Sequence, residues 1–62
     1  MRNKKIAQEY KDTAKIFVKL ANICEEIAEI YEDEKMSKEE REERSEHLIA
    51  EFIVQINKIN KL

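Results

Sequence analysis

The sequence predicts an all-α protein built as a two-helix antiparallel hairpin, and three observations support this fold class. The chain of 62 residues contains no glycine and no proline, the residues that most often mark tight turns and irregular loops. Charged residues make up 42% of it, as is typical of long amphipathic helices. The apolar residues recur at helical spacing. We therefore predict helices over about residues 3–33 and 38–60, within a single domain spanning residues 1–62.

The predicted first helix carries a long heptad pattern. Its main stripe has the alternating a/d spacing of helices that pack side by side. This stripe consists of Ile6, Tyr10, Thr13, Phe17, Leu20, Cys24, Ile27 and Tyr31. Two stripes with a seven-residue period flank it, namely Ala7, Ala14, Ala21 and Ala28, and Ile16, Ile23 and Ile30. So wide a face is typical of a bundle helix with several neighbours. The alanines predict one close helix–helix contact. Val18 is an apolar exception on the polar side of the helix.

A short turn is expected near residues 32–36, before the second helix. Ser37 and Glu40 match a capping box, in which the serine side chain accepts a hydrogen bond from the amide three residues on. Acidic Glu39 and Glu40 favour the same start, because the helix dipole attracts negative charge to the first turn. The apolar residues that follow are out of phase with a continuation of the first helix; they are Ile49, Phe52, Ile56 and Ile59. The sequence therefore predicts two antiparallel neighbours joined by a short loop.

A hairpin folded symmetrically about residues 34–36 brings the two apolar sets together. The expected facing pairs are Leu20 with Ile49, Phe17 with Phe52 or Ile53, Thr13 with Ile56, and Tyr10 with Ile59. Near the turn, Ile27, Ile30 and Tyr31 face the charged segment 38–47 and stay uncovered. Because so short a chain buries little surface, we expect a second chain to cover this patch.

The charges are segregated along the chain. Residues 1–20 carry six basic and two acidic side chains, a net of +4, and residues 21–51 carry four basic and twelve acidic ones, a net of −8. Residues 52–62 add +2, which gives the −2 of the whole chain. A hairpin therefore has a basic end and an acidic end, and two copies prefer to lie head to tail. We predict an antiparallel four-helix bundle made by two chains.

The predicted dimer or partner interface follows the apolar stripes of both helices. It consists of Ala14, Phe17, Leu20, Ala21, Ile23, Cys24, Ile27, Ala28, Ile30, Tyr31, Ile49, Phe52, Ile56 and Ile59. We expect a small helical protein that homodimerises and acts as a regulator, inhibitor or adaptor of another protein. Proteins this small are common in phages and mobile elements, and the composition is compatible with an AT-rich bacterial or viral genome. The patch around Ile27 and Tyr31 also suits capture of a target protein's helix.

Nucleic-acid binding is the alternative function. Lys4, Lys11, Lys15 and Lys19 lie at helical spacing on one exposed surface, which suits contact with a phosphate backbone. The layout also resembles the Rop family of plasmid RNA-binding proteins, with two helices, a short turn and an antiparallel dimer that has small residues in its seam. This resemblance is architectural and aligns no motif residue by residue; it favours RNA binding, for which the four lysines are the candidate contacts.

Few residues suit catalysis or metal binding. His47 has Glu43 and Glu51 one turn away on either side, but three ligands in a row on one helix cannot surround a metal ion. Cys24 is the only cysteine, and we expect it to be a small buried side chain rather than a redox group. The segment 39–46 mixes acidic residues with arginines and is typical of a solvated helix start. We therefore expect no enzymatic activity, no cofactor and no metal.

The sequence also bears on cellular location. The basic start of the chain lacks the apolar segment of a secretory signal. Its apolar runs are too short to cross a bilayer. We expect a cytoplasmic protein without membrane insertion.

Overall fold

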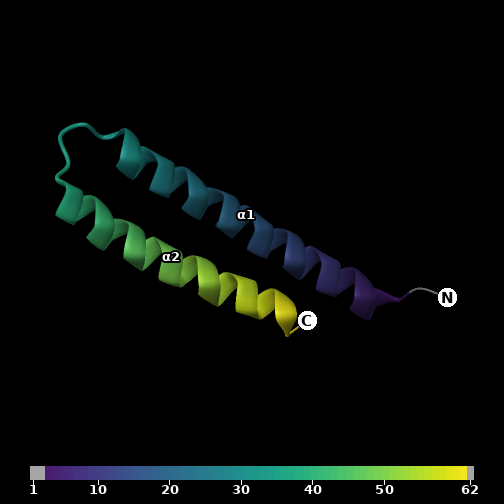
Figure 1. The fold of residues 1–62 in the computed structure, drawn as a ribbon. Coiled ribbons are helices and arrows are strands. Elements are labelled where there is room, and N and C mark those ends of the chain that lie inside the picture. The colour runs from purple at the N-terminus through teal and green to yellow at the C-terminus, as the bar shows by residue number, and fades with distance from the viewer. Residues whose placement is uncertain (1–2, 62) are drawn as a thin grey trace.

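The computed structural model describes residues 3–61, which form two antiparallel α-helices joined by a short loop (Figure 1). Helix α1 spans Lys4–Glu32 and helix α2 spans Lys38–Asn60. No strand occurs within the described residues. The predicted all-helical hairpin is confirmed, and both helices lie close to their predicted bounds.

Both helices begin at a side-chain cap. The Asn3 side chain accepts a hydrogen bond from the Ile6 amide at 3.1 Å, and the Ser37 hydroxyl accepts one from the Glu40 amide at 3.1 Å. Each cap satisfies a backbone donor that has no partner inside the helix. The serine cap predicted for α2 is therefore confirmed, and it fixes where the second helix starts.

The loop between the helices runs outward before it turns back. Figure 1 shows that the first turn of α2 lies beyond the end of α1. The Asp33 carboxylate accepts a hydrogen bond from the Lys35 amide at 2.9 Å, and the Arg41 guanidinium donates to the Asp33 carbonyl oxygen. The Tyr31 hydroxyl lies 3.4 Å from the Ser45 hydroxyl. The end of α1 therefore contacts both Arg41 in the first turn of α2 and Ser45 in its second turn.

The predicted facing pairs are wrong because of this loop. Since both helices rise equally per residue, the contact between Tyr31 and Ser45 sets Phe52 level with the turn that contains Ile23. The symmetric hairpin predicted from the sequence places Phe52 opposite Phe17, which lies more than one turn from Ile23 along α1. The shift also leaves the first turns of α1 extending past the end of α2, as Figure 1 shows.

The core between the helices uses a different stripe of α1 from the main stripe predicted. Ile16, Leu20, Ile23 and Ile30 are buried, each 8–9% exposed. The side chains that meet them from the loop and α2 are buried or half-buried; they are Met36, Arg41, Ser45, Leu48, Phe52, Gln55 and Ile59. The isoleucine stripe therefore joins Leu20 in facing α2.

Two expectations about exposure are corrected by this packing. Ile23 and Ile30 are buried and Ile27 is half-buried, so the patch expected to be uncovered near the turn is covered by α2, except for Tyr31. Cys24, expected to be buried, is exposed in the hairpin. The cause is a rotation of α1 that turns its isoleucines inward and its main stripe partly outward.

Gln55 is an unfavourable residue in this core. It is 2% exposed; its Nε2 donates to the Glu51 carboxylate at 2.7 Å, but its Oε1 has no hydrogen-bond partner among the described residues. An unpaired buried acceptor costs about 1–3 kcal/mol. Gln55→Leu should therefore raise the free energy of unfolding by about 1–2 kcal/mol, measured by urea unfolding at fixed protein concentration.

The control for this substitution lies on the same helix. Asn57 is exposed, and Asn57→Leu should change the free energy of unfolding by less than about 0.5 kcal/mol. A loss of stability in Gln55→Leu would mean that the amide makes interactions worth more than the leucine side chain.

Candidate interaction surface

One side of the hairpin is apolar and exposed. Three aromatic side chains of α1 stand in solvent: Tyr10 is 74% exposed, and Phe17 and Tyr31 are each 57% exposed. Small exposed residues lie between them, and α2 adds isoleucines that are 37–52% exposed. We call this set the apolar face; it consists of Tyr10, Ala14, Phe17, Ala21, Cys24, Ala28, Tyr31, Ile49, Ile53 and Ile56.

The contributions of the two helices lie on the same side of the hairpin. Successive helical residues advance by roughly 100°, so Phe17 and Ala21 lie about a quarter to a third of a turn from the buried stripe of α1. Ile49 and Ile56 are rotated in the same sense from the stripe of α2 that contains Phe52. Because the helices run antiparallel, equal rotations in the same sense point to one side of the pair. The apolar face is therefore a single surface built by both helices.

The residues predicted for the interface divide into two groups. Eight of them are exposed, on the apolar face: Ala14, Phe17, Ala21, Cys24, Ala28, Tyr31, Ile49 and Ile56. The others already pack between α1 and α2: Leu20, Ile23, Ile27, Ile30, Phe52 and Ile59. Ile53 belongs to the apolar face but was not predicted, although its spacing from Ile49 and Ile56 is that of a helical stripe. Contact of this face with a partner stays a prediction.

The hairpin leaves more large apolar side chains in water than it buries. Four apolar residues are buried, whereas nine large apolar residues are exposed within the described part of the chain. Each large side chain that stays in water forgoes about 1.5–3 kcal/mol. Contiguous apolar patches on small proteins mark contact surfaces. The apolar face is therefore the best candidate for a functional surface.

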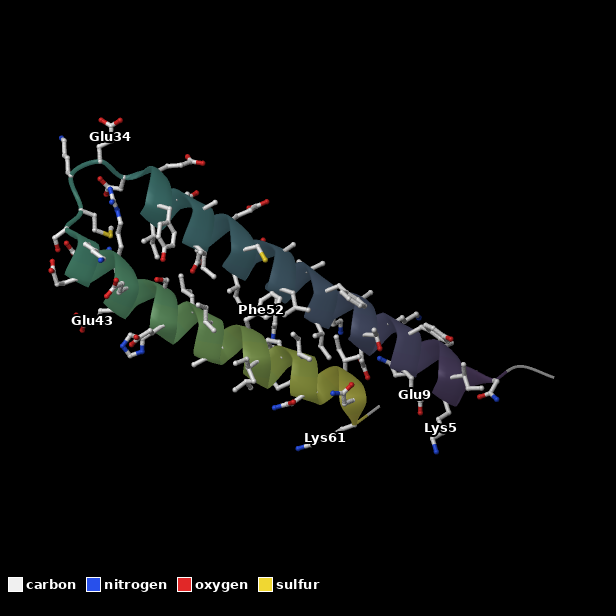
Figure 2. The ribbon with its side chains drawn as sticks, viewed as in Figure 1. Lys5, Glu9, Glu34, Glu43, Phe52 and Lys61 are labelled. Atoms are coloured by element: carbon white, nitrogen blue, oxygen red, sulfur yellow. The ribbon has the colours of Figure 1, made fainter. Side chains whose placement is uncertain are left out.

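The charged residues are sorted along the length of the hairpin. Figure 2 shows acidic Glu34 and Glu43 at the turn end and basic Lys5 and Lys61 at the other end. Figure 2 also shows Phe52 between the two helices. The ion pair between Arg44 and Glu40, at 2.9 Å, is the only one among residues 3–61. Most charges are therefore left to interact with solvent or with a partner.

The four lysines of the predicted basic surface lie on one side of α1. Lys4, Lys11, Lys15 and Lys19 are all exposed. At roughly 100° per residue they lie within about a quarter of a turn of one another, with Lys11 nearest to the apolar face and Lys19 farthest from it. Contact of these side chains with a phosphate backbone stays a prediction.

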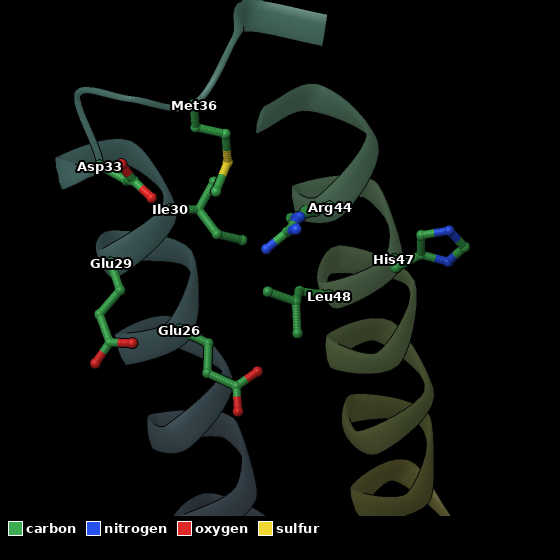
Figure 3. A pocket seen from close by; sticks show the side chains of 8 residues that line it. All are labelled: Glu26, Glu29, Ile30, Asp33, Met36, Arg44, His47 and Leu48. Carbon is green, nitrogen blue, oxygen red and sulfur yellow. The ribbon is translucent and has the colours of Figure 1, made fainter. Parts of the chain in front are cut away.

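An open cleft lies near the turn, on the side opposite to the apolar face. Its lining residues are Glu26, Glu29, Ile30, Asp33, Met36, Arg44, His47 and Leu48. Figure 3 shows Ile30, Arg44 and Leu48 projecting between the helices, while His47 points outward. No cluster of three side chains able to hold a metal ion occurs within residues 3–61, and His47, Glu43 and Glu51 do not form one. The cleft is therefore part of the charged side of the hairpin, opposite to the apolar face.

Comparison with known protein families, curated proteins and solved structures found no match to this chain. In the part of the chain that the structure describes, neither helix is long and apolar enough to cross a membrane.

Proposed function

We propose that this chain is a non-catalytic interaction protein that pairs with a second copy of itself through the apolar face. In this form it acts as a regulator, inhibitor or adaptor of another protein. The observation that carries the proposal is the apolar face itself, which both helices build and neither covers. Two such faces brought together give four helices around a shared core. The resulting antiparallel four-helix bundle is a common solution for helices with a wide apolar face.

Charge supports a copy of the same chain as the partner. Residues 21–51, which include the turn, carry a net charge of −8, whereas residues 1–20 carry +4. In Figure 2, Glu34 and Glu43 lie at the turn end and Lys5 and Lys61 at the other end. A head-to-tail arrangement places each basic end beside the acidic end of the partner. Charge then selects the orientation, while burial of the apolar face supplies most of the affinity.

Sedimentation equilibrium over a wide concentration range tests the pairing. We expect a species of twice 7.4 kDa that dissociates on dilution, with a loss of helical circular dichroism as the apolar face becomes exposed. A folded monomer at every concentration would contradict the proposal, because the apolar face would then be stable in water.

Nucleic-acid binding is a second candidate, favoured by the exposed lysines of α1. No ion pair within residues 3–61 engages Lys4, Lys11, Lys15 or Lys19, so all four are available to phosphates. A mobility shift with structured RNA and duplex DNA at two salt concentrations separates the candidates. A salt-sensitive shift that Lys15→Glu abolishes would favour nucleic acid, whereas no shift at low salt would leave a protein as the partner.

A further inference from the structure

One column of α1 has no role within the hairpin. It repeats every seven residues along the edge of the apolar face and consists of Lys4, Lys11, Val18, Glu25 and Glu32. All five side chains are exposed, and none of the charged ones forms an ion pair within residues 3–61. Val18 is 60% exposed. We call this set the edge column; its charge is positive on one side of Val18 and negative on the other.

The charges of the edge column are complementary to those of a second edge column that runs in the opposite direction. When two α1 helices lie antiparallel with their Val18 residues side by side, each Lys11 meets the partner's Glu25. In the same arrangement each Lys4 meets the partner's Glu32, which gives four pairs of opposite charge in the dimer. A parallel arrangement places like charges together along the whole column. Charges that flank a helix–helix seam set the orientation of the helices in this way.

The neighbouring columns are complementary in size for the same arrangement. One carries Tyr10, Phe17, Cys24 and Tyr31, and the other carries Ala7, Ala14, Ala21 and Ala28. The facing pairs are then Phe17 with the partner's Ala21, Tyr10 with the partner's Ala28, and Cys24 with the partner's Ala14. Each aromatic side chain meets a small one, so the helices can approach closely and interdigitate.

We infer that the second copy docks with its α1 antiparallel to α1, about a two-fold axis that passes close to Val18. The inference rests on the proposed self-association, and it specifies which helices meet and in which direction. In the register of the hairpin, this axis falls level with Lys58 in the last turn of α2. The first turns of α1, which extend past α2, then run along the acidic turn end of the partner.

Cysteine crosslinking tests this geometry. In the inferred dimer the two Cys24 residues lie about 15 Å apart along the axis, too far for a disulfide. Ala14→Cys in a chain that keeps Cys24 places a new thiol against the partner's Cys24. We expect this variant to form a disulfide-linked dimer under mild oxidation at least about tenfold faster than the wild type. Residues 14 and 24 cannot link within one helix, because they are also separated by about 15 Å.

The controls separate the inference from the proposed function. The wild type and the double variant Ala14→Cys/Cys24→Ala should both stay uncrosslinked, and circular dichroism should show that all variants remain helical. A dimer that crosslinks in the wild type, or one in which Ala14→Cys adds no crosslink, would overturn the antiparallel register while leaving self-association intact. A monomer by sedimentation equilibrium would overturn both.

Discussion

Replacing Phe17 with glutamate is expected to abolish dimerisation. Phe17 is 57% exposed near the centre of the apolar face, so the hairpin itself tolerates a charge there. In the dimer, the carboxylate of each copy would be buried against the partner's Ala21 without a basic group beside it. Each unpaired buried charge costs several kcal/mol, so the dissociation constant of the dimer should rise by on the order of 10³-fold or more. Sedimentation equilibrium measures this change directly.

Val54 provides the matched control. It is 47% exposed on the same hairpin, but it lies on the outer side of α2, away from both α1 and the apolar face. Val54→Glu makes the same change in net charge and should alter the dissociation constant by less than about threefold. Equal weakening by both substitutions would mean that glutamate acts through helix stability or net charge, and that the apolar face is not the interface.

The second large effect is expected from reversing the charges of the edge column. Lys4→Glu with Lys11→Glu turns four attractive pairs of the dimer into repulsive ones. Exposed pairs contribute about 0.2–1 kcal/mol each, so the dissociation constant at low salt should rise by about 10- to 100-fold. Adding Glu25→Lys and Glu32→Lys restores opposite charges at every pair and should bring the affinity back to that of the wild type.

The recovery distinguishes the orientation from a simple effect of charge. In a parallel dimer, like charges face each other in the wild type, in the half-reversed variant and in the fully reversed variant alike. Equal affinities for the three chains at low salt would therefore contradict the antiparallel arrangement. Lys15→Glu with Lys19→Glu serves as the control, since it changes net charge as much as the half-reversed variant but at side chains outside the inferred contact.

The helices were predictable from the sequence because their signals are local. Ser37 and Glu40 mark the start of α2 within one turn, and the out-of-phase apolar set of α2 requires a break before it. The register was not predictable, because it depends on the path of the loop. The Tyr31 hydroxyl lies against Ser45 in the second turn of α2, and Arg41 donates to the Asp33 carbonyl oxygen; symmetry alone does not suggest this offset.

The apolar face was only partly predictable, for a related reason. The width of the apolar surface of α1 indicates more than one neighbour, whichever stripe is taken first. Three adjacent stripes are apolar, however, and a rotation of α1 by less than a third of a turn exchanges which one faces α2. The burial of Ile23 and the exposure of Phe17 settle this choice within the hairpin. Val18, an exception in the sequence pattern, has a role only in the proposed dimer, where two α1 helices would meet.

The charged side of the hairpin gains a new property when two copies pair. Lys15, Lys19 and the cleft near Arg44 lie away from the apolar face, so pairing leaves them accessible. Two-fold symmetry repeats them on opposite outer surfaces of the bundle. In the proposed dimer, a ligand of this charged side would therefore meet two copies of it, and the dimer would bridge two identical ligands or two sites on one extended ligand. Its avidity for such a ligand would rise and fall with the concentration of the chain itself.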